Sequence, residues 1–528
     1  MRRRSLAAWL GAVALPAWSA DKRRYATVFD KALIATMASR EADWRIGAVS
    51  YQVYVDRFAP SRHLHAKRAL YAAPKHLRDW SEIPERGSYL QAQRVWSHEV
   101  DFWGGDLDSL SGKLDYISQL GVDVLYLNPI HLAYTNHKYD ALDYKAVSPE
   151  YGTRDDVKKL AAEVHRRGMK LVLDGVFNHM GRNAPIFLQA QADPKSPYRN
   201  WFDFNASYKG GVRVWTDAQN LPELNLENPA VQQYLWGAPD SVVRGWLHDG
   251  ADGWRLDVAF EIGPALLSKL TQAAHAQKPG SLVVGEVANY PRDWFPALDG
   301  VLGFTLRHIM LDLASGRVSS REGAAWIARM VEDTGIENML RSWIYLDNHD
   351  TARLATALPQ PAQMRLAQAL QFTLPGAPNL YYGSELGMTG ADDPEMRAPM
   401  RWDWVNESNT TLAFTRQLIQ LHKQQRALRI GNYRPITAEK LFAFERYTER
   451  ALDSAICVFN FSDTEIEEIL LIPDGKLMDN TRWRDLLSDS EWQMGSALLK
   501  LKLAPQSSVI LVPQGAPLDG YTNYKRVL

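Results

Sequence analysis

Strand-like and helix-like segments alternate along most of this 528-residue chain, and this alternation limits the folds that it can adopt. The near-continuous apolar run at 122–128 is typical of a strand that is buried on both faces of a parallel sheet. A helical pattern at 154–168 and a second apolar run at 170–176 follow, and further units of this kind bring the count near eight. The sequence therefore predicts an α/β fold, a (β/α)8 TIM barrel of parallel strands.

The alternation is interrupted once and stops well before the C-terminus. Residues 180–227 are polar and rich in proline and aromatic residues, so we expect an insertion after the third barrel strand. Beyond residue 430, five short strand-like runs are separated by Asp, Gly and Pro turns, which predicts a C-terminal antiparallel β-sandwich over 431–528. The barrel itself is expected to occupy residues 21–430.

The N-terminus has the layout of a secretory signal. Three arginines precede an apolar run and then a group of small residues, so residues 1–20 are predicted to be a cleaved signal peptide. The mature protein would then be secreted or periplasmic and free of the membrane. A net charge of −1 gives no reason to expect a nucleic-acid partner, and the sequence leaves the oligomeric state open.

Four predicted strands end in polar residues that an apolar barrel core does not need. The carboxyl ends of barrel strands converge on one pocket, so we expect three of the carboxylates, Asp257, Glu286 and Asp350, to meet there. The remaining polar residues at these strand ends are Asp174, His179, Arg255 and His349.

Three carboxylates in one pocket repel one another, so at least one is expected to stay protonated. An ionised carboxylate that attacks and a protonated one that donates are what retaining glycoside cleavage requires. Arg255 lies two residues before Asp257 and should keep it ionised as the nucleophile, whereas Glu286 has no cation beside it in sequence and should be the acid. Asp350 is expected to hold sugar hydroxyls and to stabilise positive charge on the ring.

A divalent metal site is the competing interpretation of the same residues. Asp, Glu and His side chains also bind divalent cations, which would make the protein a metallohydrolase. The chain contains no HExxH or comparable short pair of ligands, which favours the glycosidase.

The polar strand ends closely resemble the conserved regions of the α-amylase family of glycoside hydrolases. The matching stretches are DGVFNH at 174–179, GWRLDVAF at 253–260, GEVANY at 285–290 and LDNHD at 346–350, in the family's order. FWGGDL at 102–107, HKYDALDY at 137–144, LPELN at 221–225 and YYGSELGM at 381–388 also match. The resemblance covers the whole chain after the signal.

The resemblance implies a barrel with a B domain at 180–227 and a C-terminal sandwich. It assigns the nucleophile to Asp257, the general acid/base to Glu286 and the transition-state-stabilising role to Asp350. It places Tyr139, His179, Arg255 and His349 at sugar-binding positions. No cofactor is required for the chemistry, and a structural calcium ion is implied at Asn178, although the loop after the first strand lacks the Asp- and Asn-rich ligands that some relatives have.

Residues 258–261, Val-Ala-Phe-Glu, are closer to the cyclodextrinase, neopullulanase and maltogenic amylase group than to many α-amylases. The segment before Ala48 is too short for the N-terminal β-domain that supports dimers in that group, so an expectation of dimers does not carry over to this chain. We expect a retaining α-glycosidase that hydrolyses α-1,4-glucosidic bonds in starch, maltodextrins or cyclodextrins through a covalent glycosyl-enzyme. The alternatives are an α-1,6-acting or transglycosylating member, or a barrel that has lost catalysis and only binds.

Overall fold

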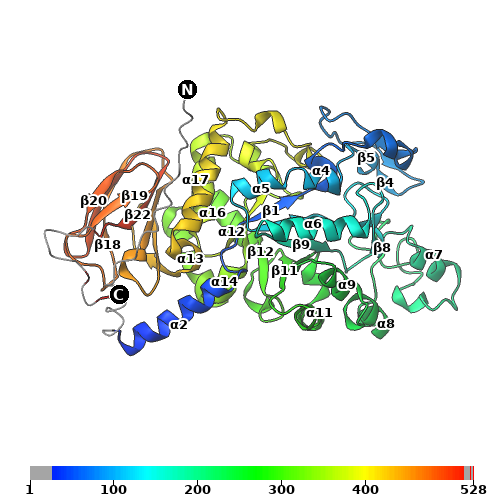
Figure 1. Ribbon diagram of the computed structural model, residues 1–528, viewed down its shortest axis with the longest axis horizontal. Helices are drawn as coiled ribbons and strands as arrows, with labels where there is room; N and C mark the ends of the chain where they lie inside the picture. The colour runs from blue at the N-terminus through cyan, green and yellow to red at the C-terminus, as the bar shows by residue number, and fades with distance from the viewer. Residues whose placement is uncertain (1–25, 516–523, 525–526) are drawn as a thin grey trace, which may run out of the picture.

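The computed structural model describes residues 26–515, 524 and 527–528 (Figure 1). The predicted signal peptide at 1–20 lies outside this range. Within the described residues, no helix combines the length and the apolar character that crossing a membrane would require.

Eight parallel strands form a closed barrel at the centre of the molecule. Each strand pairs with its neighbours in chain order, and the last strand pairs with the first. The predicted (β/α)8 barrel is therefore confirmed. The strands are β1 (Ser50–Val53), β6 (Val124–Leu127), β9 (Lys170–Gly175), β10 (Gly253–Leu256), β11 (Leu282–Val287), β12 (Gly300–Gly303), β13 (Trp343–Ile344) and β14 (Ala377–Tyr381).

Helices pack around the barrel, and α6 (Arg154–Arg166) illustrates why they form where they do. Thr153 and Asp156 make a capping box at its start, and buried Val157, Leu160, Ala161 and Val164 recur at helical spacing. Apart from α7 and α8, which are described below, the other α-helices of the described residues are α2 (Val28–Ala42), α3 (Val55–Phe58), α4 (Leu107–Ser111), α5 (Leu114–Leu120), α9 (Val242–His248), α10 (Ala259–Ile262), α11 (Pro264–Gln277), α12 (Phe304–Ala314), α13 (Ser320–Thr334), α14 (Ile336–Arg341), α15 (Leu354–Ala357), α16 (Pro361–Thr373), α17 (Thr410–Gln424) and α18 (Arg426–Ile430).

Two helices that the sequence predicts as continuous are broken in the structure. The expected helix at 102–120 is α4 and α5, which Gly112 separates. The expected helix at 231–248 is α8 (Pro229–Gln232), a π-helical turn at Gln233–Gly237 and α9. Pro239 lies in the second break, where its missing N–H and its ring prevent a continuous helix.

The segment after β9 projects from the end of the barrel that lies away from the C-terminal sheets (Figure 1). It contains α7 (Pro185–Ala192), a 3₁₀ turn at Arg199–Trp201 and isolated β-bridges. The boundaries of 180 and 227 for a B domain stay a prediction. Short paired strands also lie in two other segments that connect barrel elements. The segment between β1 and α4 contains β2 (His76–Leu77), β3 (Tyr89–Leu90), β4 (Val95–Trp96) and β5 (Asp101–Phe102), and the segment after β6 contains β7 (His131–Ala133) and β8 (Ala141–Val147).

The C-terminal region consists of antiparallel sheets with their own core, so the predicted sandwich is confirmed. Six strands pair in the order β15-β16-β17-β22-β19-β20, and β18 pairs with β21. β15, β19 and β20 were not expected; β15 contains Pro435, which an edge strand tolerates. The strands are β15 (Asn432–Ile436), β16 (Phe442–Tyr447), β17 (Ala455–Asn460), β18 (Ile466–Leu471), β19 (Arg482–Asp485), β20 (Glu491–Gln493), β21 (Leu498–Leu503) and β22 (Ser507–Pro513).

Arg446 of β16 joins this region to the barrel helices. Its buried guanidinium donates hydrogen bonds to the carbonyl oxygens of Thr373, at 2.7 Å, and of Gly431, at 3.0 Å. Both carbonyls lie at helix C-termini, where backbone oxygens lack helical partners and carry partial negative charge. The cation therefore satisfies groups that would otherwise be buried without a hydrogen bond.

Candidate active site

Arg255 of β10 occupies the centre of the site. In the parallel register it lies between Asp174 of β9 and Val284 of β11. Its Nη1 donates to Asp174, at 2.9 Å, and to Asp257, at 3.0 Å, while Nη2 lies 2.7 Å from Oε1 of Glu286. This guanidinium is fully buried and contacts three carboxylates from three neighbouring strand ends.

The contact between Arg255 and Glu286 corrects the expectation that Glu286 has no cation beside it. Glu286 has no cation beside it along the chain, but Arg255 reaches it from the adjacent strand. Arg255 pairs with Val284 in register, and Glu286 is two residues further along β11, so both side chains point to the same face. The absence of a cation therefore does not distinguish Glu286 as the acid.

The pKa of Asp257 also differs from the sequence expectation. Burial raises the pKa of the Asp257 carboxyl well above its usual range, and the neighbouring Glu286 carboxylate raises it further. Arg255 lowers this pKa, but it is shared among three carboxylates and does not compensate. The direction of this shift is opposite to the prediction that Arg255 keeps Asp257 ionised, because burial and Glu286 outweigh Arg255 in the free protein.

Val258, immediately after Asp257, has an unusual backbone that supports Glu286. Its φ of 47° lies in the left-handed region, which is strained for a β-branched residue. In this conformation its N–H donates to Oε2 of Glu286 at 3.0 Å. The strained turn at the end of β10 thus holds a carboxylate of β11.

Asp350 follows β13 and is more exposed than the other two carboxylates of the predicted trio, with 41% of its side chain accessible. Burial opposes its ionisation, but the neighbouring His349 and Arg397 outweigh burial and lower the pKa of Asp350. Nη2 of Arg397 donates to Asp350 at 3.0 Å, and Nε2 of His349 lies 2.9 Å from the same carboxylate. Asp350 is therefore ionised at neutral pH.

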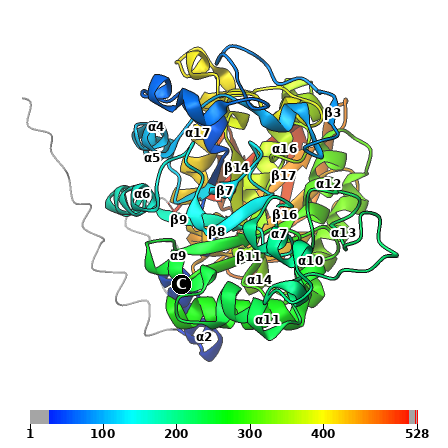
Figure 2. The same ribbon diagram turned by 90° about the vertical axis from the view of Figure 1, so that its right-hand side faces the viewer.

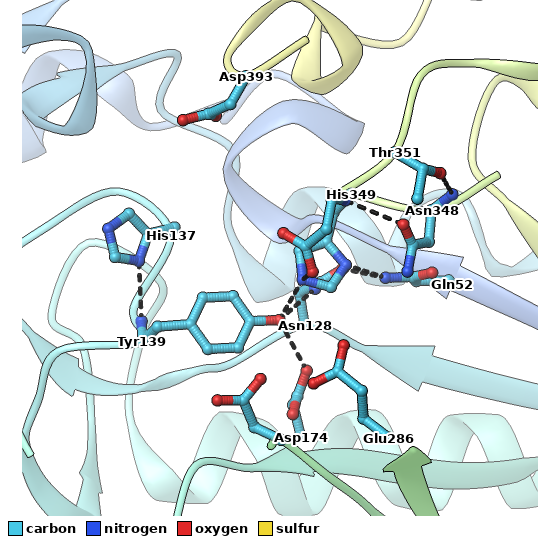
Figure 3. Close-up of polar contacts among 12 residues, drawn as sticks. Gln52, Asn128, His137, Tyr139, Asp174, Glu286, Asn348, His349, Thr351 and Asp393 are labelled. Carbon is cyan, nitrogen blue, oxygen red and sulfur yellow. Dashed lines mark hydrogen bonds and ion pairs between the residues drawn. The ribbon is translucent and has the colours of Figure 1, made fainter. Parts of the chain in front are cut away.

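Tyr139 lies between β7 and β8 and reaches into the same network (Figure 3). Its hydroxyl donates to Asp174 at 3.0 Å, accepts from the amide of Asn128 at 3.1 Å and contacts Nε2 of His349. The rings of Tyr139 and His349 are nearly parallel, with centroids 5.3 Å apart. Its ring is only partly buried, which fits a surface for a sugar better than a core position.

His179 is buried beside Asp257, with Nε2 at 4.0 Å from its carboxylate, and packs against the indole of Trp215. Burial lowers the pKa of His179 to about 3, so the imidazole is neutral at neutral pH. Neither ring nitrogen has a hydrogen-bond partner among the described residues. A neutral ring with an unpaired donor and an unpaired acceptor is suited to a sugar hydroxyl.

Asn178 was predicted to bind calcium. Its amide nitrogen donates to Glu261 at 3.3 Å, and its backbone carbonyl accepts from Leu224. Across the described residues, no three His, Cys, Asp or Glu side chains converge as metal ligands. Calcium binds six to eight oxygens. A calcium site at Asn178 stays a prediction, and the chemistry below does not use it.

The structure brings together all seven predicted catalytic and sugar-binding residues and adds three that the sequence analysis missed. Gln52 donates to Nδ1 of His349 at 2.8 Å, and Asn128 and Arg397 make the contacts given above. Gln52 and Asn128 are polar residues in or at the end of predicted strands, so a search for polar residues at such positions could have found them. Arg397 follows the last barrel strand in an irregular segment, and no pattern in the sequence marks it.

Comparisons with known proteins agree with this geometry. The family described as alpha amylase, catalytic domain, matches residues 52–432. Neopullulanase 2 of Thermoactinomyces vulgaris is 33% identical over 486 residues, which are 89% of this chain and 78% of the relative. A cyclomaltodextrinase of Thermoanaerobacter pseudethanolicus is 30% identical over 487 residues, again 89% of this chain and 78% of the relative.

Solved structures show the same likeness. Cyclic α-maltosyl-(1→6)-maltose hydrolase from Arthrobacter globiformis, in complex with maltose, superimposes with a TM-score of 0.74 and 27% identity, covering 89% of this chain and all of that chain. The native debranching enzyme of Nostoc punctiforme has a TM-score of 0.75 and 28% identity, covering 89% and 98%. The chain therefore belongs to the α-amylase family of glycoside hydrolases, as its motifs predict.

Proposed function

We propose that this glycoside hydrolase is a retaining α-glycosidase that cleaves α-1,4-glucosidic bonds in starch, maltodextrins or cyclodextrins. The observation that carries the proposal is the convergence of Asp257, Glu286 and Asp350 from three strand ends on one network of contacts, two of them on the guanidinium of Arg255. Related proteins that act on α-glucans support the substrate class.

In the proposed reaction, Glu286 donates its proton to the glycosidic oxygen while an oxygen of Asp257 attacks the anomeric carbon. The C–O bond to the leaving sugar breaks, and a glycosyl ester forms on Asp257. Glu286 then removes a proton from water, which attacks the anomeric carbon and releases Asp257 with overall retention. The reactive state in this proposal is the one in which Glu286 carries the proton and Asp257 is ionised, and positive charge developing on the sugar favours ionised Asp257.

The remaining side chains bind and orient the sugar in this proposal. Ionised Asp350 accepts hydrogen bonds from hydroxyls and stabilises positive charge on the ring. Neutral His179 and the neighbouring His349 contact hydroxyls, and the ring of Tyr139 packs against the apolar face of the sugar. Asp174 holds Arg255 and Tyr139 in place.

The three carboxylates alone do not select which glucosidic bond is cleaved or how long the substrate chain is. An α-1,6-acting or transglycosylating enzyme would use the same three carboxylates, and the names of the relatives include both debranching and cyclodextrin-opening enzymes. Phe260, in the segment 258–261, is 45% exposed near the end of β10, so it is available to contact sugar beyond the cleaved bond. A binding protein without catalysis is disfavoured because all three carboxylates are present and clustered.

We also propose that the protein is exported, from the charge and hydropathy pattern of residues 1–20 alone. N-terminal sequencing of the protein isolated from culture medium, periplasm and cytoplasm is expected to begin near residue 20 or 21 in one of the first two fractions. An intact Met1 in the cytoplasm as the sole product would refute export.

Replacing Glu286 by Gln should lower kcat/KM on maltotriose by about 10²–10⁴, because proton donation to the leaving oxygen is lost. Glu163→Gln is the matched control, since this carboxylate of α6 contacts Arg166 and Arg167 and no residue of the trio. A 5-fluoroglycosyl fluoride should label Asp257, as peptide mass spectrometry would show. Unchanged activity of Glu286→Gln, or labelling at another residue, would contradict the assigned roles.

Asp257→Asn should abolish activity but raise the thermal unfolding midpoint at pH 7. The folded-state pKa of Asp257 is raised above the unfolded value of about 3.9, so ionisation destabilises the fold increasingly above that pH, and the gain in unfolding midpoint should disappear near pH 4.

Asp350→Asn should have the opposite effect on the unfolding midpoint at pH 7, because the lowered pKa of Asp350 contributes stability above about pH 3.9. Calorimetry between pH 4 and 7 measures both, and equal signs for the two variants would contradict the electrostatic description.

Product analysis over time on soluble starch, β-cyclodextrin, pullulan and maltotriose tests the substrate. Cyclodextrin opening faster than starch cleavage is expected from the likeness of 258–261 to the cyclodextrinase group. Cyclodextrin left intact, with mixed maltodextrins from starch, would instead indicate an endo-acting amylase. Thermal unfolding measured with and without a chelator should show a lower midpoint in the presence of the chelator if Asn178 takes part in a calcium site.

A further inference from the structure

Two packed helices and the loop after β11 enclose a groove that the proposed reaction does not use. Helices α12 and α13 lie side by side at the edge of the barrel (Figure 2). Thr305, His308, Ile309 and Asp312 of α12 form one wall, and Trp326, Arg329 and Met330 of α13 form the other. Ala288 and Tyr290 close one end, and the cavity has a volume of about 470 Å³.

The groove exposes two large aromatic side chains. Trp326 is 47% accessible and Tyr290 is 40% accessible. Burying such surfaces is favourable, so leaving two of them in one concavity is a cost that needs an explanation. The hydroxyl of Tyr290 donates to Asp333 at 3.0 Å, and Nε of Arg329 donates to the same oxygen at 2.7 Å, so the Tyr290 ring is held in position.

Polar groups around these rings point to a neutral ligand rich in hydroxyls. Nδ1 of His308 donates to the carbonyl of Phe304, which leaves Nε2 available in the groove. Asp312 pairs with Arg317 at 2.6 Å, and Asp333 pairs with Arg329 at 2.7 Å. Each carboxylate is matched by a cation, so the groove has no excess charge that would select an ion.

We propose that the groove between α12 and α13 is a second binding site for an α-glucan segment, with Trp326 and Tyr290 as sugar-stacking surfaces. The proposal rests on the proposed function, because it takes the ligand to be the same polymer. Ala288 is only two residues beyond Glu286, so the groove begins close to the strand end that carries this carboxylate. A chain bound at both places would raise the local concentration of substrate at the cleft.

A sugar fits this groove better than a protein partner does. Its volume lies within the range of about 300–1,000 Å³ that is typical of small-molecule sites. A stable protein interface buries about 800 Å² on each partner and is broader and flatter than a concavity lined by nine residues. Paired charges and ring faces beside hydrogen-bonding groups are the chemistry that a neutral sugar requires.

Affinity electrophoresis in gels containing amylopectin tests the second site. In the Glu286→Gln background, which is expected not to consume the polymer, Trp326→Ala should weaken retention by about three- to tenfold, the effect of losing one aromatic contact. Trp326→Phe should restore most of it. If Trp326→Ala does not fold, Tyr290→Ala is the second variant, because Tyr290 lies in a loop rather than in a helix.

Controls separate this site from the cleft. With Glu286 intact, Trp326→Ala should lower kcat/KM on amylopectin severalfold and leave kcat/KM on maltotriose unchanged. Phe29→Ala, which removes an exposed aromatic from α2, should change neither. Failure of the proposed function would appear separately, as unchanged hydrolysis by Glu286→Gln.

Three results would overturn the proposal. The first is unchanged retention for both Trp326→Ala and Tyr290→Ala. The second is an equal loss of activity on maltotriose and amylopectin, which would assign the residues to the cleft. The third is a dimer in light scattering that Trp326→Ala dissociates without loss of retention, which would make the groove a protein interface.

Discussion

One buried cation shared by three carboxylates is the interaction on which the active site depends. Arg255 is fully buried and contacts Asp174, Asp257 and Glu286, so the centre carries more negative than positive charge. Burying like charges costs stability, and the raised pKa of Asp257 is the measure of this cost. The same imbalance favours the protonated form of Asp257 in the free protein. Stability is given up here for chemistry, a common compromise in enzymes.

The closed barrel is what makes this arrangement possible. Parallel strands in register place Asp174, Arg255 and Val284 side by side, and the carboxylate-bearing residues follow within two positions. The fully buried sheet supplies rigid positions for these side chains, whereas the surrounding loops supply Tyr139, Asp350 and Arg397. Val258 at the end of β10 has a strained left-handed backbone, and its N–H holds Glu286 from the neighbouring strand.

The surface around the barrel extends the same chemistry outward. In the proposed function the substrate is a glucan polymer, so side chains outside the catalytic trio would also hold it. Phe260 lies three residues after Asp257, and Trp326 and Tyr290 line the groove between α12 and α13. These exposed aromatics differ in position from the residues proposed to bind sugar at the active site.

The sequence by itself determined the barrel, the C-terminal sandwich and seven residues of the active site. Buried parallel strands produce long apolar runs, and polar residues at their ends stand out against that background, which is why Asp257, Glu286 and Asp350 were found. Only the tertiary structure decided which charges meet. The contact between Arg255 and Glu286, the hold of Arg397 on Asp350 and the groove between α12 and α13 all join segments that are separate in the chain. Electrostatic energy depends on distance in space, and the sequence gives distance only along the chain.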